Sequence, residues 1–306
     1  MEQIMFIKAA NLWKADKAPQ IKLSSLAAYS LTIRKHLEPR FLWLFDITAE
    51  SVQRLVDDEL EAGNNLVTVK GIITVLKMII RFCEEQGWIE ERKYDVVFPR
   101  REATPDPQVL PVEDEKRLLA WLAENPTLPN IGLMICLCCG LRIGEVCGLK
   151  CEDIDYHDRV LRVRRTVYRV YNKYSLEKRS KLTIGVPKTR NSHREIPLPE
   201  FLMRILIDKR SRVSSQKYLL SKRPQPFDPQ ALRYHFDKAT SILGLPHRKV
   251  HSLRHTFATR CVESKCDIKT LSSLLGHSDV STTLNLYVHP SLEQKRRCVE
   301  DMMRLF

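Results

Sequence analysis

The chain has 306 residues, enough for about two domains, and its 50 Lys and Arg against 37 Asp and Glu give a net charge of +13. Apolar residues make up 43% and charged residues 28%, which is a globular composition and excludes a collagen-like or disordered chain. The most apolar stretch, near Asn130–Leu141, is too short to cross a bilayer, and the first residues lack the pattern of a secretory signal. We therefore expect a cytoplasmic protein with no membrane partner.

The first third of the sequence has the periodicity of helices. Three are expected: from Ser24 or Ser25 to His36, from Thr48 to Ala62, and over Leu66–Gln86. Residues 1–107 carry 15 basic and 16 acidic residues, so their charge is nearly balanced. About twenty residues precede the first expected helix, so we expect no further small N-terminal domain. We predict a helical domain over residues 1–98.

A proline-rich segment separates this domain from the rest. Residues 99–111 hold four prolines with polar residues between them and are interpreted as a linker, followed by a second domain over residues 112–306. Expected helices are Val112–Glu124, Asn130–Cys139, Pro199–Val213, Asp228–Leu243, Ser252–Ser264, Asp267–Leu275, Ser281–Val288 and Leu292–Leu305, and expected strands are Val160–Val170, Lys181–Val186 and Glu195–Leu198. The fold class predicted is mainly α with a small β-sheet (α+β).

The positive charge is concentrated in the second domain. Residues 108–306 carry 35 basic and 21 acidic residues, a balance of +14. Arg159–Arg194 alone holds twelve basic residues against the single acid Glu177. A field of this sign attracts polyanions, of which nucleic acid is the usual one, although a solvated charged surface is the alternative.

The nine cysteines indicate no metal site. Cys136, Cys138 and Cys139 lie in an apolar helical pattern, with Cys147 and Cys151 just after it. Free thiols are among the most buried side chains, so we interpret these as reduced core residues. We expect neither a metal nor another cofactor.

Four short stretches of the second domain carry the residues suited to chemistry: GLRIGEVCGLKCEDID from Gly140, the polar hairpin tip PKTRNSHR, HSLRHTFATR, and LLGHSDVSTTLNLY. In the first, Glu145 lies one helical turn after Arg142 and can orient its guanidinium. In the third, His251, Arg254 and His255 stand at i, i+3 and i+4, so all three project from one helical face.

Together these stretches resemble the tyrosine recombinase (phage integrase) family. The family pattern is an Arg in G-L-R-x-x-E, a Lys on a β-hairpin, H-x-x-R, L-G-H and a C-terminal Tyr. Six residues match it in order: Arg142, Lys188, His251, Arg254, His277 and Tyr287. The resemblance is strong over Gly140–Pro290 and looser over the first hundred residues, which look like the family's helical, SAM-like core-binding domain. It implies a site-specific DNA recombinase or integrase with a C-terminal catalytic domain.

The chemistry of the implied reaction explains these residue types. Attack on a phosphodiester adds charge to its non-bridging oxygens, which Arg142, Arg254 and His251 or His277 could stabilise. With a pKa near 10, about one tyrosine in a thousand is ionised at pH 7, and nearby cations favour the phenolate of Tyr287. The resemblance assigns protonation of the departing 5′ oxygen to Lys188 and implies a 3′-phosphotyrosyl intermediate formed without metal or ATP.

The resemblance also implies the partners. These are double-stranded DNA, three further copies of the chain in a homo-tetramer on synapsed DNA sites, and accessory DNA-bending proteins. Nucleoid association follows from the first of these. The expected helix Leu292–Leu305 would pack either on a neighbouring subunit or back on its own domain.

Taken singly, each residue also has a structural interpretation. Arg142 and Glu145 could form a surface ion pair, and Lys181 is a rival to Lys188. His251 and His255 could be a hydrogen-bonded core pair, with His255 the more structural of the two. His277 could cap a helix, and Tyr287 could be a packing residue. The ordered set of six favours the catalytic interpretation.

Three other functions share parts of this pattern. A type IB topoisomerase-like enzyme would relax DNA through the same chemistry. A catalytically inactive relative would bind DNA with strong salt dependence but not cleave it. A metal nuclease using His and Glu residues is the weakest of the three.

Overall fold

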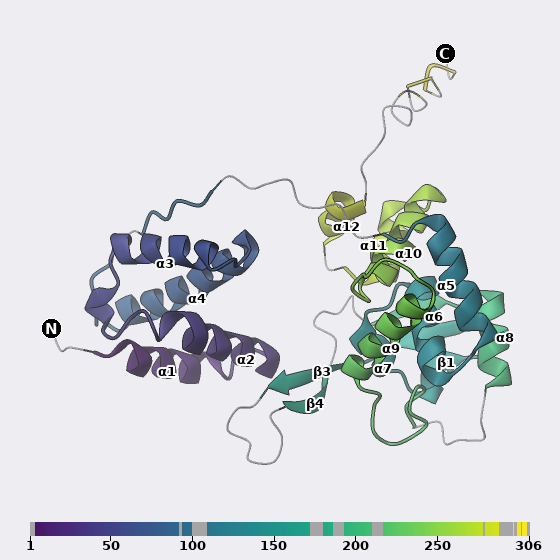
Figure 1. Ribbon diagram of the computed structural model, residues 1–306, viewed down its shortest axis with the longest axis horizontal. Coiled ribbons are helices and arrows are strands. Elements are labelled where there is room, and N and C mark those ends of the chain that lie inside the picture. Colours follow the sequence, from purple (N-terminus) through teal and green to yellow (C-terminus); the bar gives the residue numbers. More distant parts are fainter. Residues whose placement is uncertain are drawn as a thin grey trace. The chain divides into compact units, whose positions relative to one another are not determined.

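The computed structural model describes residues 4–91, 94–99, 109–171, 180–185, 193–209, 217–277, 279–287, 296, 299–300 and 302–304. The chain divides into two compact units, Met1–Thr104 with Val170–Lys181, and Pro105–Arg169 with Leu182–Phe306. Helices dominate both units and the strands form two small sheets (Figure 1), so the predicted α+β fold class is confirmed. Among these residues no helix is both long and apolar enough to cross a membrane.

The first unit is a group of helices around one apolar core. Its elements are α1 (Phe6–Lys17), α2 (Leu23–Thr32), the π-helical turn η1 (Ile33–Leu37), the 3₁₀ turn η2 (Leu44–Asp46), α3 (Ala49–Glu61) and α4 (Leu66–Glu85). The longest helix, α4, begins where the Asn65 side chain accepts a hydrogen bond from the Thr68 amide at 2.9 Å. It packs against α1, α2 and α3 through the apolar positions that its periodicity predicted.

The start of this unit differs from the prediction. No helix was expected before Ser24, yet α1 buries Phe6, Ala9, Ala10 and Trp13 at helical spacing. Two of those four positions are alanines and no side chain caps the helix, so the sequence signal is weak. The next helix begins at Leu23 rather than at a serine cap, and continues past Thr32 as the π-helical turn.

The second unit combines eight described helices with a three-stranded sheet and with the larger part of a two-stranded one. The helices are α5 (Val112–Glu124), α6 (Leu128–Cys139), α7 (Ile143–Cys147), α8 (Glu200–Asp208), α9 (Pro229–Ile242), α10 (Ser252–Glu263), α11 (Ile268–Leu275) and α12 (Val280–Tyr287), with a 3₁₀ turn at Cys151–Asp153. The strands are β1 (Ile154–Asp155), β2 (Val160–Val163), β3 (Thr166–Tyr171), β4 (Ser180–Gly185) and β5 (Arg194–Pro197).

The strands make a three-stranded antiparallel sheet in the order β1-β2-β5 and a two-stranded β3-β4 pair. In the larger sheet Leu161 pairs with Ile196 and Val163 with Arg194, which places Arg194 at the edge nearest α11. The single strand expected over Val160–Val170 is two strands. Between them the Arg165 side chain binds Asp153 and the Gly148 carbonyl, and this contact interrupts the strand pairing.

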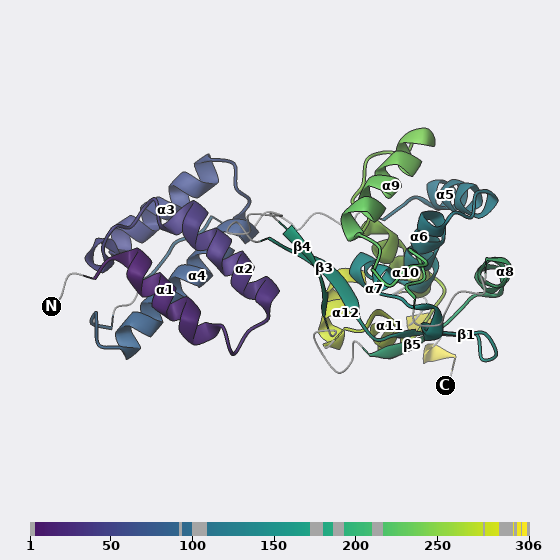
Figure 2. The same cartoon turned by 90° about the horizontal axis from the view of Figure 1, so that it is seen from below.

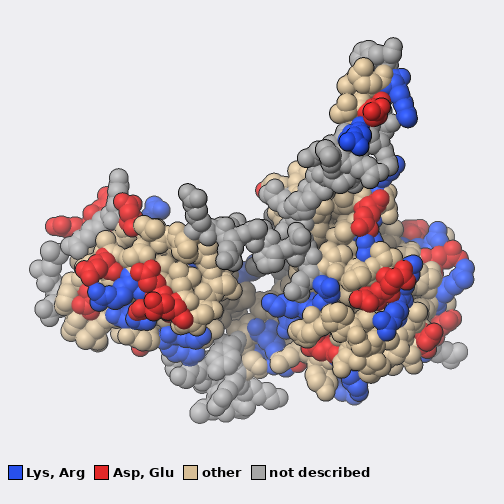
Figure 3. All heavy atoms as spheres, turned by 45° about the horizontal axis from the view of Figure 1, so that its top comes forward, with Lys and Arg blue, Asp and Glu red and all other residues tan. Residues whose placement is uncertain are grey.

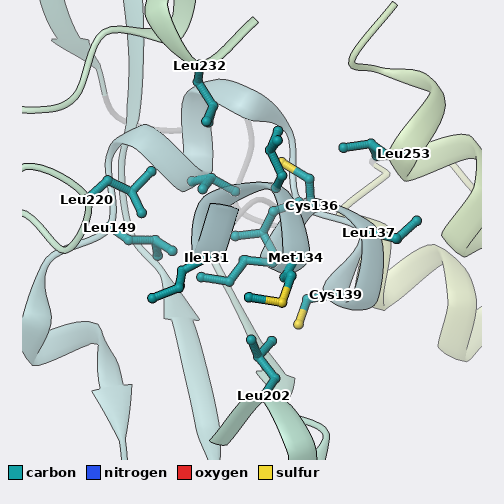
Figure 4. Close-up of a cluster of buried hydrophobic side chains, with 14 of the residues drawn as sticks. Ile131, Met134, Cys136, Leu137, Cys139, Leu149, Leu202, Leu220, Leu232 and Leu253 are labelled. Atoms are coloured by element: carbon teal, nitrogen blue, oxygen red, sulfur yellow. The ribbon is translucent and has the colours of Figure 1, made fainter. Parts of the chain in front are cut away.

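Helix α6 forms the centre of the second unit. It packs against α5, α7, α8, α9 and α10, and nearly all of its residues are buried. Figure 4 shows leucines of the surrounding elements directed at it, among them Leu149, Leu202, Leu232 and Leu253. Figure 2 shows α5, α9 and α10 around the same helix, with the larger sheet beside α11. The apolar run that was too short for a bilayer is therefore the core helix.

The cysteines of this core are buried free thiols. Cys136, Cys139 and Cys147 are buried, and desolvation raises the pKa of each thiol well above its usual value of 9.0. A raised pKa keeps the sulfur protonated and unreactive at neutral pH, which agrees with their interpretation as core residues.

Several predictions fall outside the described residues. Lys188 is one, together with most of the linker at 99–111 and most of the helix expected at Leu292–Leu305. In the view of Figure 3, acidic and basic side chains are interspersed on both units. Part of the basic segment Arg159–Arg194 also lies outside the described residues, so we assign its positive charge to no single face of the second unit.

A glycine follows the C-terminal end of each of the helices α6 and α11. Gly140 follows α6 with φ +65°, and Gly276 follows α11 with φ +65°, the left-handed conformation that favours glycine at a helix C-terminus. A Cβ on Gly140 would lie 2.4 Å from Phe257 Cδ1 and 3.2 Å from Leu275 Cδ2. Gly140 therefore allows both the turn and the close approach of α10 and α11.

We expect Gly140→Ala to destabilise the protein by roughly 2–5 kcal/mol, of which about 1–2 is the left-handed backbone and the rest overpacking. Gly244→Ala is the matched control, because Gly244 has φ +64° and nothing within 4 Å of its Cβ position. Gly244→Ala should lower the free energy of unfolding only by the backbone contribution of about 1–2 kcal/mol. Urea unfolding of both variants measures the difference, and equal losses would contradict the packing argument.

Candidate active site

Arg254 is the buried centre of the site. It lies on α10, is 2% exposed, and donates from Nη1 to the Gly140 carbonyl at 2.9 Å and from Nη2 to the Leu275 carbonyl at 2.7 Å. These carbonyls belong to the C-terminal ends of α6 and α11, where helices leave acceptors unpaired and carry partial negative charge. Burial, opposed by the charge of Glu145, lowers the pKa of Arg254 to about 9, so the guanidinium stays charged at pH 7.

Glu145 joins two further arginines. Its carboxylate is 4% exposed and accepts from Arg142 Nη1 at 3.0 Å and the Arg142 backbone N–H at 2.9 Å. It also accepts from Arg194 Nη1 at 3.2 Å and Nη2 at 2.9 Å, a forked pair. Burial alone would raise the pKa of Glu145, but the hydrogen bonds and charges of Arg194 and Arg142 outweigh it and lower that pKa. Glu145 therefore stays ionised and fixes both guanidinium groups.

The C-terminal end of α11 receives all three arginines. Leu275 O accepts from Arg254 and, at 3.4 Å, from Arg142 Nη1, while Leu274 O accepts from Arg194 Nε at 2.6 Å. Of the three guanidinium side chains, Arg142 is 39% exposed and Arg194 is 4% exposed. The cluster therefore presents one accessible cation, Arg142, supported by two buried ones.

His277 is held in one tautomer. Its Nε2 lies 2.9 Å from Arg254 Nη2 and its Nδ1 lies 2.8 Å from Thr283 Oγ1, a fully buried hydroxyl of α12. Because a guanidinium only donates, Nε2 must accept, and the proton must be on Nδ1, which donates to Thr283. Burial and the charge of Arg254 lower the pKa of His277 to about 4, so the ring is neutral at pH 7.

His251 stands at the start of α10 beside His255. The two rings meet edge to face with centroids 4.7 Å apart. Partial burial of the ring and the nearby His255 and Arg254 lower the pKa of His251 to about 4, although part of the residue stays exposed. His251 is therefore also neutral at pH 7.

Tyr287 lies at the end of α12, which packs against α10 and α11. The residue is 7% exposed, and its ring packs with Ala258, Leu271 and Leu275. Its hydroxyl is 2.7 Å from His255 Nδ1. Burial raises the pKa of Tyr287, opposed by the charges of Arg254 and Arg142, so the phenol is protonated at neutral pH.

The structure thus brings together five of the six predicted residues, in two groups. Arg142 and Arg254 share the Leu275 carbonyl and Arg254 bonds to His277, while His251 and Tyr287 both contact His255. The two groups lie close enough for the charges of Arg254 and Arg142 to act on His251 and Tyr287. Lys188 lies outside the described residues.

Sequence reasoning missed two residues of the site. Arg194 was counted only in the basic segment, and His255 was interpreted as structural. The helical spacing of His255 from His251 was a signal for its place in the site.

An open groove lies beside the cluster. Its volume is about 850 Å³, and it is lined by β2, β5, α11 and the residues that follow α11. Arg164, His193 and Lys269 contribute to its walls, together with Arg194 and His277. The groove adds accessible positive charge next to the buried arginines.

Chemically, the site joins fixed cations, neutral imidazoles and one phenol. Cations of this kind bind an anion and stabilise charge that develops on it, and a phenol can act as a nucleophile once its proton is removed. Over the described ranges, no group of three or more His, Cys, Asp or Glu side chains is placed to hold a metal ion.

We expect Glu145→Gln to destabilise the protein by about 3–5 kcal/mol at pH 7, because it leaves two buried or half-buried cations without their carboxylate. The pKa of Glu145 is depressed in the folded state, so its contribution is complete above the ordinary value of 4.5 and is lost as the pH falls through the lower folded value. The difference in unfolding free energy between wild type and variant should therefore shrink below about pH 4.5.

Urea unfolding from pH 7 to pH 3 measures this. Glu195→Gln is the control, since Glu195 pairs with Arg162 at 2.9 Å but is 65% exposed, and its loss should cost less than about 1 kcal/mol. A difference for Glu145→Gln that is independent of pH would contradict the assignment.

Curated relatives of this chain are tyrosine recombinases. The chain is 29% identical over 281 residues to a "Tyrosine recombinase XerC-like" protein of Caldanaerobacter subterraneus, covering 85% of this chain and 72% of that protein. It is 24% identical over 282 residues to "Tyrosine recombinase XerA" of Thermococcus onnurineus, covering 90% and 88%.

Solved structures share the fold. The Tn1549 transposon integrase in complex with a circular intermediate DNA matches with a TM-score of 0.78 at 20% identity, over 97% of this chain and 99% of that one. A lambda integrase tetramer bound to a Holliday junction matches with a TM-score of 0.68 at 18% identity, over 94% and 78%. The sequence profile of the phage integrase family matches residues 108–294, which hold every residue of the cluster described above. This chain belongs to the phage integrase family.

Proposed function

We propose that the protein is a site-specific DNA recombinase that cuts and rejoins DNA strands through Tyr287. The observation that supports the proposal is that Tyr287, two histidines and two arginines of the family pattern lie close together in the second unit, where the charges of Arg254 and Arg142 act on Tyr287, His251 and His277. Its membership of the phage integrase family and its tyrosine recombinase relatives support the same reaction. The topoisomerase-like and inactive alternatives have no observation of their own in their favour.

In this proposal the arginines bind the scissile phosphate. Arg142 is the accessible guanidinium, and its Nη1 bonds to Glu145 and the Leu275 carbonyl. Its Nε and Nη2, which have no hydrogen bond to another described residue, can donate to a non-bridging oxygen. Arg254 and Arg194 add buried positive charge that stabilises the extra charge of the transition state. As a neutral ring, His251 can donate one hydrogen bond to the phosphate without adding a proton to it. The single N–H of neutral His277 is bonded to Thr283, so His277 acts by orienting the Arg254 guanidinium through Nε2.

The covalent step exchanges one phosphodiester for another. Tyr287 Oη attacks phosphorus, the bond to the 5′ oxygen breaks, and a 3′-phosphotyrosyl link and a free 5′ hydroxyl result. Lys188 would give the departing 5′ oxygen its proton, a role that rests on the family pattern. Because the link conserves the bond energy, a second 5′ hydroxyl can displace the tyrosine without ATP or metal.

The partners follow from the relatives. Family members of this fold have been solved with transposon DNA and as a tetramer on a Holliday junction, and we propose duplex DNA and a homo-tetramer on two synapsed sites for this chain. The excess positive charge of the second domain supports DNA as the partner. Accessory DNA-bending proteins are proposed on the family pattern alone.

We expect Tyr287→Phe to bind DNA like wild type but to form no covalent adduct. The substrate is a nicked duplex that carries an inverted core sequence, to be identified in the DNA beside the encoding gene. Cleavage releases the short fragment with the free 5′ hydroxyl, so the strand cannot be rejoined and the covalent adduct accumulates. Denaturing gels detect the adduct, and band shifts check binding. An adduct with the Phe variant would show that another residue is the nucleophile.

We expect Thr283→Val to slow cleavage of the same duplex by roughly 10- to 100-fold, because a buried hydrogen bond of His277 loses its partner and the ring its orientation. Thr283→Ser should restore most of the rate. Thr282→Val is the control, since Thr282 is an exposed neighbour on the same helix. Single-turnover rates measure all three, and equal rates for both valine variants would contradict a role for Thr283.

A further inference from the structure

His255, like Arg194, is a residue of the site that the family pattern does not use. Its Nδ1 lies 2.7 Å from Tyr287 Oη, and the ring centroids are 5.6 Å apart with the planes at 50°. Within the described part of the chain, the side-chain hydrogen bonds of Arg142 and Arg254 go elsewhere, to Glu145, His277 and the carbonyls of Gly140 and Leu275. The phenolic hydroxyl is therefore bonded to an imidazole and not to a guanidinium.

The fold fixes the His255 ring in this position. Helix α10 carries it one residue after the buried Arg254, and α12 packs across α10 so that Tyr287 meets it. His251 also contacts the His255 ring, edge to face. A ring held by two neighbouring rings, with one nitrogen on the hydroxyl, is already oriented for proton transfer.

The electrostatics suit a proton acceptor. Burial and the charge of Arg254 lower the pKa of His255 below its ordinary 6.5, so the imidazole is neutral and has a free lone pair at neutral pH. The phenol beside it is buried and has a raised pKa. A buried phenol that must become a nucleophile needs a base within hydrogen-bond reach, and His255 is in that place.

We propose that His255 is the general base of strand cleavage, accepting the phenolic proton of Tyr287 on Nδ1 as the tyrosine attacks phosphorus. The inference rests on the proposed function, with Tyr287 as the nucleophile. The Oη–H bond breaks and an Nδ1–H bond forms, while the Oη–P bond forms and the P–O5′ bond breaks. In rejoining, the imidazolium returns that proton to the departing Tyr287 oxygen, so one histidine serves both directions.

The first test separates the base from the acid. Wild type and variants cleave the nicked duplex under single-turnover conditions, once with the natural 5′ oxygen at the scissile phosphate and once with a bridging 5′ sulfur. A thiolate departs without needing a proton, so the cleavage rate of Lys188→Ala should return toward that of wild type on the sulfur substrate. His255→Gln should be slower by roughly 10²- to 10⁴-fold on both.

His235→Gln is the matched control. His235 lies on α9, is also partly buried with a lowered pKa, and bonds to Asn130 Oδ1 at 2.5 Å away from the site. The His235→Gln variant should cleave at the wild-type rate. Band shifts show whether His255→Gln still folds and binds DNA. If the cleavage rate of His255→Gln recovered on the sulfur substrate, the assignment of His255 as base would be overturned.

The pH profile distinguishes a base from a residue that only positions the tyrosine. Among the described residues, the charged and titratable groups around the pair are His251 before α10, Arg254 on α10, Arg142 before α7 and His277 after α11. From pH 5 to 8 His251 and His277 stay neutral and Arg254 stays charged. In this range wild type should reach a plateau above the pKa of His255, whereas His255→Gln should speed up about tenfold per pH unit as phenolate forms.

Imidazole added to His255→Gly should restore part of the cleavage rate. The inference would be overturned if the cleavage rate of His255→Gln reached the same plateau with pH as that of wild type. It would also be overturned if imidazole restored no cleavage to His255→Gly. If wild type itself forms no adduct, the proposed function fails instead, so the two failures are distinguishable.

Discussion

A buried carboxylate and the C-terminal end of one short helix hold three like charges together. Arg142, Arg194 and Arg254 would repel one another, yet Glu145 pairs with two of them and the last carbonyls of α11 accept hydrogen bonds from all three. Buried cations are tolerated only where such acceptors are fixed in advance. The site therefore depends on the course of the backbone at Gly140 and Gly276, which sets where those carbonyls point.

Much of the fold could be predicted from periodicity. The helix over Val112–Glu124 has the predicted bounds, and the α4 helix ends within one residue of its predicted end, because apolar spacing and a following stop signal agree there. The prediction of a single strand over Val160–Val170 was wrong. The alternation of apolar and basic residues continues across the break between β2 and β3, so the sequence shows no interruption. The interruption comes from contacts of Arg165 with Asp153 and Gly148, which no local pattern contains.

The site could be predicted as a set of residues but not as a set of contacts. The order of short motifs pointed to Arg142, His251, Arg254, His277 and Tyr287, and Lys188 stays a prediction. Arg194 is 49 residues from Glu145, and His255 is 32 residues from Tyr287, so each pairing exists only after distant helices and strands pack. Charge counting placed Arg194 in a basic segment expected to attract polyanions or to be solvated, whereas Arg194 is one of two buried arginines among the described residues.

The eight residues of α12 have a mechanical consequence. Thr283 and Tyr287 are one turn apart on this helix, the first setting the tautomer of His277 and the second supplying the phenol. A displacement of α12 would therefore move the Tyr287 phenol and release the His277 imidazole in the same movement. The position of this one short helix thus couples two parts of the site that no hydrogen bond joins directly in the described residues.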